Sequence, residues 1–465
     1  MHAPLALPLL RSPPFPGISP EIAAVSVRRA SPLGGTPELA RATALVDAID
    51  AGGVAGDFWD HEAQPVSLQP YRDDPELAWR SLIGDIAYRD PFTGAEASAE
   101  DAVILLAHWR TEIRRNPGWG GRHVLGVGIA KWKQREVAHL LWAGSGSRID
   151  FGKGGRLGGV DALAAWPARS DPGLVAKAAE AGLPYWRVED GFIRSVGLGA
   201  ACHPPFSIVM DSAGAHYDPS GPSDLETLLA TSEFPSALLA RADALIALIV
   251  RAGISKYEIG SGFAPLPPKS RRRILVTGQV EDDLSVLLGG GAVRSNLELL
   301  RRARAAEPEA EIWFKPHPDV DAGHRKGHVA DSDALLHADQ VVRGVPMASL
   351  FGAIDGLHVL TSLAGFEALL RGVEVTTHGT PFYAGWGLTR DLGTVPPRRN
   401  RRLALNQLAA GVLLLYPKYL DPITGLPCTP EILIHRLSEQ KRPQETWLTR
   451  LRNLQGKLRR RISQL

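Results

Sequence analysis

Short apolar segments that alternate with helical segments are the feature that most constrains how this chain can fold. In the first half, residues 123–129 and 184–188 are typical of strands, and residues 173–181 form a helical pattern that Gly182 ends. The second half repeats this order, with strands expected at 273–277, 311–314, 357–360 and 373–376, a helix opened by a capping box at Ser295, and a helix at 363–371. Alternating strands and helices form parallel sheets covered by helices. The sequence therefore predicts an α/β fold with two such sheets.

The composition is that of a globular protein, and it excludes several classes. The chain has 465 residues, 44% of them hydrophobic, and its 52 Lys and Arg are nearly balanced by 50 Asp and Glu. That balance argues against general polyanion binding, so no nucleic-acid partner is expected. The two cysteines, Cys202 and Cys428, provide no disulfide framework. The longest apolar run, 408–416, is far shorter than the roughly 20 residues of a membrane-spanning helix, and the first residues do not resemble a secretory signal, so a cytoplasmic protein is expected.

The domain boundaries follow the same pattern. Two α/β domains are expected at 119–265 and 271–440, whereas residues 1–60 lack sustained periodicity and are expected to be poorly defined. Tyr88-Arg-Asp-Pro-Phe-Thr-Gly94 recurs as Tyr419-Leu-Asp-Pro-Ile-Thr-Gly425. Asp-Pro and Thr-Gly are common in turns, so chance explains part of this match. The alternative interpretation is that residues 61–118 are the remnant tail of a preceding module.

Two acidic motifs follow expected strands. Glu189 and Asp190 come directly after an apolar strand and before a glycine, at the end of a parallel strand where ligands bind. Asp283 ends a second acidic cluster beyond the strand 273–277. We expect the two clusters to meet at one site. Solvated surface turns are the alternative for both.

Two further motifs suit a phosphate-bearing ligand. Lys315 and His317 follow the strand 311–314, and the prolines on either side of His317, including Pro318, restrict the backbone there. Thr361 and Ser362 stand directly before an expected helix, where hydroxyls and unpaired amides can bind phosphate. Ordinary helix capping by Ser362 needs no ligand and is the alternative.

Four further patterns in the sequence give weaker predictions of binding sites. Gly126-x-Gly128 lacks the third glycine of a dinucleotide motif, and the Asp331-Ser-Asp333 segment with its neighbouring histidines gives only a weak metal prediction, so no metal is expected. Tyr383 and Trp386 stand in a glycine-rich aromatic loop suited to sugar contact or to simple packing. Residues 441–465 have apolar residues at helical spacing among many arginines, which predicts a basic amphipathic helix for an anionic membrane surface; docking on its own protein or on a partner helix is the alternative.

Taken in order, these motifs resemble a known family. Glu189-Asp-Gly191, Gln279-x-x-x-Asp283, Lys315-Pro-His-Pro318 and the segments 361–370 and 381–389 are similar to the capsular polysaccharide KpsC/LipA proteins, which are bacterial β-Kdo glycosyltransferases. The likeness runs from about residue 80 to 430. Family members usually carry two modules, and this chain resembles a single C-terminal-type module with the tail of a first.

The resemblance implies a GT-B architecture, in which two Rossmann-like domains face each other across a cleft that holds CMP-Kdo. Asp190 or Glu189 would supply a catalytic carboxylate, and Asp283 the nucleophile, although its neighbour Asp282 remains an alternative. Lys315, His317 and Pro318, with Thr361, Ser362 and Gln279, fall on donor-binding positions. Because the donor sugar carries a carboxylate, we expect a cation nearby, and Arg194 is the candidate.

The resulting hypothesis is a retaining transferase without metal or other cofactor. It transfers Kdo from CMP-Kdo to a lipid-linked saccharide acceptor during synthesis of the capsular polysaccharide linker. The family would place it in the cytoplasm, peripheral on the inner face of the cytoplasmic membrane, near other capsule biosynthesis and export proteins. The alternatives are another GT-B nucleotide-sugar transferase or epimerase-like enzyme, and a non-catalytic scaffold for capsule assembly.

Overall fold

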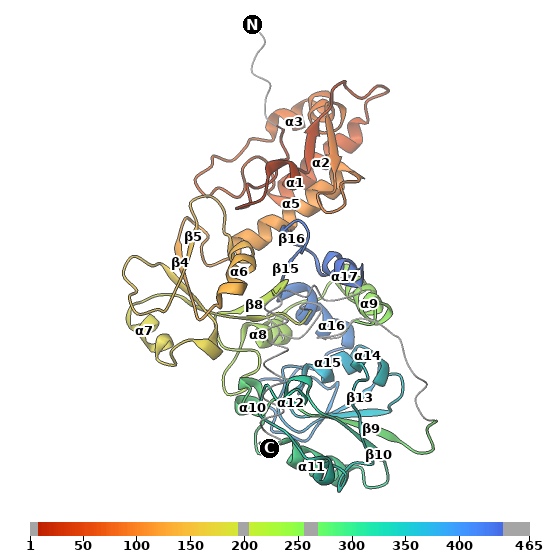
Figure 1. The fold of residues 1–465 in the computed structure, drawn as a ribbon. Coiled ribbons are helices and arrows are strands. Elements are labelled where there is room, and N and C mark those ends of the chain that lie inside the picture. Colours follow the sequence, from red (N-terminus) through yellow and green to blue (C-terminus); the bar gives the residue numbers. More distant parts are fainter. Residues whose placement is uncertain (1–7, 194–203, 255–267, 440–465) are drawn as a thin grey trace. The chain divides into compact units, whose positions relative to one another are not determined.

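The computed structural model describes residues 8–193, 204–254 and 268–439 (Figure 1). The chain divides into two compact units. Unit 1 comprises Met1–Trp186 and Lys418–Cys428, and unit 2 comprises Arg187–Pro417 and Thr429–Leu465. This division does not follow the expected boundary between 265 and 271, which stays a prediction. Both units are α/β structures, so the predicted fold class is confirmed at that level.

Unit 1 contains three small groups of strands and the helices around them. The helices are α1 (Pro20–Ala23), α2 (Leu39–Gly52), α3 (Gln69–Asp73), α4 (Pro75–Trp79), η1 (Arg80–Gly84), α5 (Ala99–Arg114), η2 (Lys131–Lys133), α6 (Gln134–Leu141), η3 (Pro167–Arg169) and α7 (Leu174–Glu180). The strands are β1 (Ser26–Arg28), β2 (Ile86–Arg89), β3 (Glu96–Ala97), β4 (His123–Val127), β5 (Arg148–Gly152), β6 (Ala162–Ala165), β15 (Lys418–Leu420) and β16 (Pro427–Cys428). β4 lies between β5 and β6 and is parallel to both.

Unit 2 is built around a larger sheet. That sheet comprises β9 (Arg273–Thr277), β10 (Glu311–Lys315), β11 (Gln340–Val341), β12 (Gly356–Val359), β13 (Glu374–Thr377) and β14 (Arg390–Asp391), whereas β8 (Ser207–Asp211) and the second part of β7 (Tyr185–Asp190) belong to another sheet. Its helices are α8 (Asp224–Thr231), α9 (Ser236–Arg251), α10 (Leu284–Gly289), α11 (Asn296–Ala306), α12 (Pro318–Asp321), α13 (Asp331–Ala334), α14 (Met347–Leu350), α15 (Leu363–Leu369), α16 (Leu405–Ala409), η5 (Ala410–Leu415) and α17 (Pro430–Glu439).

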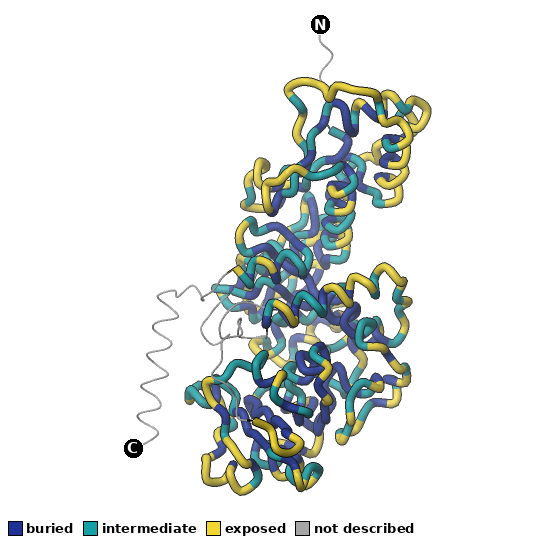
Figure 2. The backbone as a smooth tube through the Cα atoms, turned by 90° about the vertical axis from the view of Figure 1, so that its right-hand side faces the viewer, coloured by how far each residue is buried: buried dark blue, intermediate teal, exposed yellow. Residues whose placement is uncertain are grey.

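The six-stranded sheet of unit 2 agrees closely with the sequence pattern. Its strand order is β11-β10-β9-β12-β13-β14, and every neighbouring pair is parallel. β9 spans the predicted residues 273–277, and all five are buried. Continuous burial of this kind is expected for a strand covered on both faces, and Figure 2 shows such strands enclosed by more exposed segments. The predictions for this sheet are therefore confirmed.

Two predictions for the first half are wrong in part. The first sheet was expected to be wholly parallel, but β8 runs antiparallel to β7, with Asp190 opposite Ile208. Residues 1–60 were expected to be poorly defined, but α2 is a regular helix whose face of Ala42, Leu45 and Ile49 is buried. Glycines and prolines flank α2 and interrupt the helical spacing on both sides of it.

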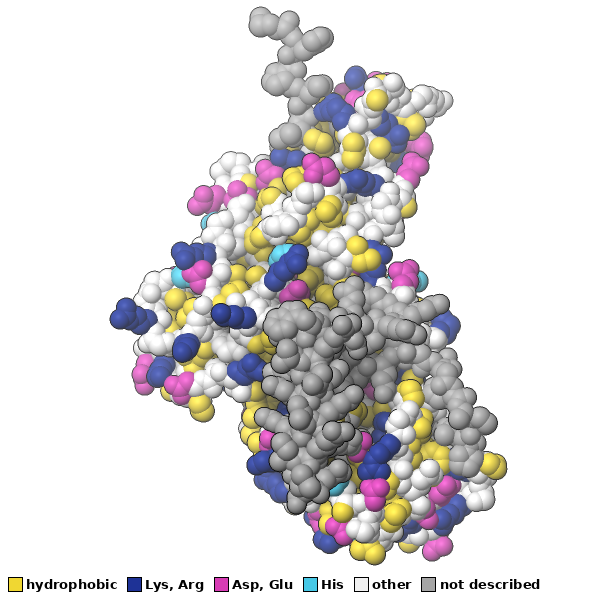
Figure 3. All heavy atoms as spheres, in the orientation of Figure 1, with side chains coloured by type: hydrophobic (Ala, Val, Ile, Leu, Met, Phe, Trp, Pro, Cys, Tyr) yellow, Lys and Arg dark blue, Asp and Glu magenta, His cyan; other side chains and the backbone are white. Residues whose placement is uncertain are grey.

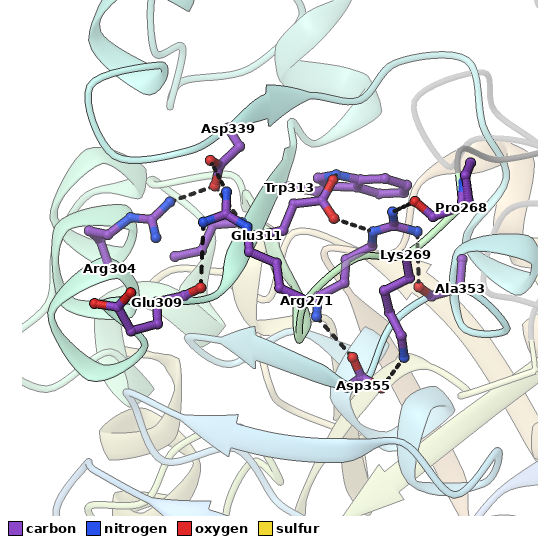
Figure 4. Close-up of polar contacts among 12 residues, drawn as sticks. Pro268, Lys269, Arg271, Arg304, Glu309, Glu311, Trp313, Asp339, Ala353 and Asp355 are labelled. Atoms are coloured by element: carbon purple, nitrogen blue, oxygen red, sulfur yellow. Dashed lines mark hydrogen bonds and ion pairs between the residues drawn. The ribbon is translucent and has the colours of Figure 1, made fainter.

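A network of charges fixes the amino ends of β9 and β10 (Figure 4). The guanidinium of Arg273 lies 4.1 Å from the ring centre of Trp313 and donates to Glu311 at 2.9 Å. Arg271 and Arg304 both donate to Asp339, each at 2.6 Å. A buried guanidinium is tolerated only when its donors are paired, which these contacts provide. The network locks the edge of the sheet opposite to the candidate site.

The seven-residue sequence repeat extends into a structural repeat. Asp90 accepts from the amide of Phe92 and the hydroxyl of Thr93, and Asp421 accepts in the same way from Ile423 and Thr424. Both turns follow a π-helix and a short strand, and both lead through a second strand into a helix. The two segments are therefore built alike from α4 to α5 and from α16 to α17.

Each copy of the repeat is joined to a similar preceding helix. Arg41 of α2 forms a two-fold hydrogen bond with Glu100 at 2.8 and 2.8 Å, and Arg241 of α9 forms one with Glu431 at 2.8 and 3.0 Å. α2 packs against α4 and α5, as α9 packs against α16 and α17. The assignment of residues 61–118 to a preceding module stays a prediction, but these segments share one architecture.

We expect the buried pair of Glu112 and Lys418 in unit 1 to make stability depend on pH. Their Oε2 and Nζ atoms are 2.7 Å apart. Burial alone would raise the pKa of Glu112, but the charges of Lys418 and Arg115 lower it to about 2. Because the folded pKa lies below the unfolded value, the stabilisation is complete above about pH 4.5 and is lost as the pH falls toward 2.

Glu112→Gln should therefore lower the free energy of unfolding by about 3 kcal/mol at pH 7 and by clearly less at pH 3. Urea unfolding at the two pH values measures this difference. Glu76→Gln, which changes an exposed acid, is the control and should have little effect at either pH. An equal loss for Glu112→Gln at both pH values would contradict this role of the pair.

Candidate functional site

The expected site residues of unit 2 gather at the carboxyl edge of its six-stranded sheet. β9, β10 and β12 are neighbours, and in their register Thr277 lies opposite Lys315 while Val276 lies opposite His358. The segments that follow these three strands therefore leave the sheet side by side. They are the segments that carry the Gln279, Lys315 and Thr361 motifs. Ligands bind at this edge in open α/β sheets.

Gln279 connects two of these segments through its side-chain amide. Its Oε1 accepts from the Thr361 amide at 2.8 Å, and its Nε2 donates to the Thr361 Oγ1 at 3.0 Å. Asn296 fixes the backbone of Gln279 by accepting from its N–H and donating to its carbonyl, each at 2.8 Å. Gln279 is buried and its amide is committed to Thr361. The structure therefore gives it a positioning role behind the site.

The structure distinguishes Asp283 from Asp282. Asp282 is exposed and forms an ion pair with Arg325 at 3.1 Å. Asp283 is half-buried at the start of α10, where its Oδ1 accepts from the amide and the hydroxyl of Ser285 at 3.0 and 2.9 Å. These bonds hold the Asp283 carboxylate in one orientation. Of the two, Asp283 is the one built into the site.

Glu189 and Asp190 end β7, and successive strand residues point to opposite faces. Only one of them can therefore face a given group. The Tyr217 hydroxyl donates to Glu189 Oε1 at 3.1 Å. Burial, then the charge of Glu189 with its hydrogen bond, and then the charge of Asp283 raise the pKa of Tyr217 well above its usual value. Glu189 is thus the acid that contacts this phenol, and the charge of Asp283 adds to the rise in its pKa. Sequence reasoning did not identify Tyr217, because nothing in its local pattern marks it.

A buried carboxylate holds the loop that carries Tyr217. Asp211, at the end of β8, accepts from the amides of Ala213 and Gly214 at 3.1 and 2.7 Å. Its other oxygen accepts from the Asp224 amide at 2.9 Å and from the Tyr416 hydroxyl at 2.8 Å. Burial raises the pKa of Asp211 despite these bonds. The loop between β8 and α8 is therefore anchored at both ends, which fixes where Tyr217 lies.

Cations lie on two of the strands, Arg187 on β7 and Lys315 at the end of β10. Arg187 lies on β7 two residues before Glu189, and its charge acts on Tyr217 in opposition to the carboxylates. Lys315 is buried, and its Nζ donates to the Val345 carbonyl at 2.7 Å. Arg194, the expected partner of a sugar carboxylate, lies outside the described residues.

His317 has a defined tautomer in this structure. The Asp319 amide donates to its Nδ1 at 3.1 Å, so in the neutral ring the proton is on Nε2. The ring is half-buried, and Pro318 begins α12 directly after it. An Nε2–H group can donate to an anionic oxygen, which agrees with the expected phosphate contact.

The aromatic loop is packed inside the protein, and Ser362 caps a helix, as the structural alternatives for these two motifs predict. Tyr383 and Trp386 have no exposed surface, which agrees with a packed loop. The Tyr383 hydroxyl donates to the Ser362 carbonyl, and the Trp386 Nε1 donates to the Phe382 carbonyl at 2.9 Å. Ser362 Oγ accepts from the Ala364 amide at 3.2 Å and so caps α15. These residues therefore support the site from behind.

Two observations on the described residues concern metal binding and membrane spanning. Among them there is no group of three or more His, Cys, Asp or Glu residues placed to hold a metal ion. None of the helices within residues 8–193, 204–254 and 268–439 is both long enough and apolar enough to span a bilayer. The expected basic helix at 441–465 lies outside the described residues.

Three comparisons relate the chain to known proteins. Residues 161–419 match the family described as Capsule polysaccharide biosynthesis protein. The chain is 39% identical over 364 residues to the capsule polysaccharide modification protein LipA of Neisseria meningitidis serogroup A, a match that covers 77% of this chain and 51% of LipA. It is 41% identical over 268 residues to the lipopolysaccharide-processing protein LpsZ of Rhizobium meliloti, covering 57% of this chain and 61% of LpsZ. The chain thus spans about half to three fifths of these relatives.

Two solved structures are similar. Both are KpsC proteins of Thermosulfurimonas dismutans, one a β-Kdo 2,4 transferase and the other a β-Kdo 2,7 transferase. The first has a TM-score of 0.60 and 34% identity, and the match covers 68% of this chain and 97% of that one. The second has a TM-score of 0.56 and 32% identity, and the match covers 69% and 100%.

The Gln279 bridge can be tested by its effect on stability. In Gln279→Leu, the Thr361 amide loses its acceptor in a buried place, so we expect the free energy of unfolding to fall by about 1–3 kcal/mol. Urea unfolding measures this loss. Gln340→Leu, at an exposed glutamine of β11, is the matched control and should change little. Identical unfolding midpoints for the two variants would show that the bridge does not hold these segments together.

Proposed function

Because the chain belongs to the capsule polysaccharide biosynthesis family, we propose that it is a retaining β-Kdo glycosyltransferase, which transfers Kdo from CMP-Kdo to a glycolipid acceptor. One observation carries this proposal: the Tyr217 hydroxyl donates to Glu189 at 3.1 Å, and the charge of Asp283, from a motif far away in the sequence, also raises the pKa of this phenol. Retention requires two inversions, and therefore a carboxylate nucleophile with a second group for proton transfer. The names of the KpsC neighbours support the sugar.

In the first step, an oxygen of Asp283 attacks the anomeric carbon of Kdo. The bond between that carbon and the phosphate oxygen breaks, and CMP leaves with the electron pair. Kdo has no hydroxyl next to its anomeric carbon, so the enzyme must supply this nucleophile. The bonds from Ser285 to Asp283 Oδ1 keep the carboxylate oriented for the attack.

In the second step, a hydroxyl of the acceptor attacks the same carbon. Its proton passes to the Glu189 carboxylate, and the ester bond to Asp283 breaks, which restores the free carboxylate. We assign this proton transfer to Glu189 rather than to Asp190, because the hydrogen bond from the Tyr217 hydroxyl orients the Glu189 carboxylate. The net result is a new glycosidic bond with the donor's configuration retained.

Fixed cations would stabilise the leaving group. We assign contacts with the CMP phosphate to His317 through Nε2–H and to Lys315, with Thr361 held in place by Gln279. Donors aimed at the oxygen that gains charge are a major source of catalysis, and no metal ion is needed for this role. Among the residues that the structure describes, Arg187 lies two positions before Glu189 on β7. We propose that its charge neutralises the sugar carboxylate, a role for which Arg194 is the other candidate.

The acceptor and the location complete the proposal. We propose a lipid-linked saccharide acceptor at the inner face of the cytoplasmic membrane, with the basic segment 441–465 on the anionic surface. Incubation of the purified chain with CMP-Kdo and a Kdo-terminated glycolipid should give a product longer by one Kdo. Binding of CMP without any such product would count against the transferase. Preference for UDP over CMP in thermal-shift titration would favour a different nucleotide-sugar enzyme.

The two acid pairs provide matched controls for the assigned roles. Asp283→Asn should lower kcat by at least about 10³-fold, and Glu189→Gln by about 10²- to 10⁴-fold. Asp282→Asn and Asp190→Asn, one position away in each case, should keep most of the activity. Intact-mass spectrometry after mixing with donor should find a Kdo adduct in the wild type and none in Asp283→Asn. An adduct mapped to Asp282 would refute the assignment.

Tyr217→Phe tests whether the shared hydroxyl matters for catalysis. The raised pKa keeps this phenol protonated throughout the working pH range, so it donates to Glu189 at every pH tested. Its removal should lower kcat about tenfold and move the acidic limb of the pH–rate profile to higher pH, because the ionised carboxylate loses a donor.

Tyr88→Phe is the control for this substitution. Its hydroxyl is buried and donates to the Leu82 carbonyl at 2.8 Å in unit 1, so it also loses a buried hydrogen bond. The control should lower stability and leave the pH–rate profile in place. An unchanged profile in Tyr217→Phe would remove this residue from the mechanism.

A further inference from the structure

Unit 1 has a glycine-rich basic loop directly after strand β5. Residues 152–159 read Gly-Lys-Gly-Gly-Arg-Leu-Gly-Gly in the sequence, and the strand before them is the outer neighbour of β4. The last residues of β4, β5 and β6 are in register, since Val127 lies opposite both Gly152 and Ala165. The loops after these three parallel strands therefore emerge at one edge of the sheet.

This edge carries a marked excess of positive charge. The segments 128–136, 153–160 and 166–173 contain six cations against two acids, Glu136 and Asp171. The cations are Lys131, Lys133, Arg135, Lys153, Arg156 and Arg169. Lys177 pairs with Asp171 at 2.9 Å, and burial raises the pKa of Glu136, so both acids are weakened as partners. Figure 3 shows Lys and Arg side chains over the part of unit 1 that contains β4, β5 and α7.

Most of these cations are available to a ligand. Lys131, Arg135, Lys153, Arg156 and Arg169 are exposed, and within the described part of the chain none of them forms an ion pair. An unpaired surface lysine is ordinary by itself. Several from three adjacent strand ends, without opposing acids, produce a local positive potential although the whole chain is nearly neutral.

The glycines make the backbone of this loop accessible. Gly154 and Gly159 have φ values of 73° and 75°, which side chains rarely adopt. A Cβ atom placed at Gly155 or Gly158 would meet nothing within 4 Å, so the surface there is open. Loops of this kind expose successive backbone N–H groups to an anion.

The loops after β4 and β6 pack against each other beside the glycine-rich loop. A Cβ atom at Gly128 would lie 2.9 Å from the carbonyl oxygen of Trp166, so the loops after β4 and β6 are in direct contact. Lys133 is buried, with its Nζ 3.5 Å from the centre of the Trp166 ring. This cation–π contact holds a positive charge inside the edge.

We infer that this basic edge binds the saccharide head of the glycolipid acceptor through the carboxylates of its sugars. The inference rests on the proposed transferase function for the identity of the acceptor. The evidence for a binding site is the excess positive charge, the open glycine loop and the two packed loops beside it. Each Kdo residue of such a head carries one carboxylate. The edge offers cations and backbone amides to this group.

The experiment measures binding apart from catalysis. The full chain is titrated by calorimetry with the methyl glycoside of Kdo, with the methyl ester of that glycoside, which lacks the charge, and with inorganic phosphate. The same titrations use Lys153→Glu/Arg156→Glu/Arg169→Glu. The control is Arg80→Glu/Arg251→Glu/Arg301→Glu, which reverses three exposed arginines elsewhere. Acceptor KM and kcat are measured for all three proteins.

The expected result is a loss of affinity for the Kdo glycoside of about tenfold or more in the edge variant, with little change in the control. The wild type should bind the ester more weakly than the acid, and added salt should weaken binding of the acid. Acceptor KM should rise while kcat stays near the wild-type value.

Three outcomes would overturn the inference: equal affinity for acid and ester, equal affinity in the edge variant and the wild type, or inorganic phosphate binding as tightly as the glycoside, which would indicate a general anion site. The role of the basic edge and the proposed transferase function can be refuted independently. Transfer by the wild type with an unchanged acceptor KM in the edge variant would refute the edge alone. Edge-dependent binding of the glycoside without any transfer would refute the enzyme and keep the edge.

Discussion

The candidate site depends on one buried amide, the side chain of Gln279. A buried amide must have its donors and acceptor satisfied, and here Thr361 satisfies both ends of it. Because Gln279 follows β9 and Thr361 follows β12, the amide fixes two neighbouring strand ends relative to each other. Thr361 in turn lies 3.5 Å from Ser285, whose hydroxyl bonds to Asp283. The position of the acid is thus set by polar contacts that reach into the interior of the sheet.

The two edges of this sheet use charge in different ways. At the amino edge, Arg273 is paired with Glu311 and lies over Trp313, so its charge is used up within the fold. At the carboxyl edge, Asp283 is oriented but only half-buried, and Tyr217 carries the influence of two carboxylates at once. Pairing stabilises the first edge. A carboxylate that is oriented yet still partly exposed is typical of a place where a ligand binds.

The sequence was sufficient for the strands of unit 2 and insufficient for several features that depend on partners. β9 and β10 are continuous apolar runs, which a pattern analysis detects. The antiparallel course of β8 depends on pairing with β7, and no local pattern contains that information. Tyr217 is a comparable case, because its role arises from Glu189 and Asp283, both distant in the sequence. The motif Leu-Ala-Arg-Ala occurs at 39–42 and again at 239–242, so the similarity of α2 to α9 is present in the sequence itself.

The structural repeat separates the framework of this protein from its chemistry. Arg41 with Glu100 joins α2 to α5, and Arg241 with Glu431 joins the corresponding helices α9 and α17, and these ion pairs are far from the acid motifs in sequence. Glu189 and Asp283 both lie in segments that the repeat does not include. A repeated element of this kind can close or brace a domain in either place. The unrepeated segments carry the oriented carboxylate of Asp283, the Tyr217 phenol that donates to Glu189, and the His317 imidazole that accepts from a backbone amide, so the proposed chemistry rests on them.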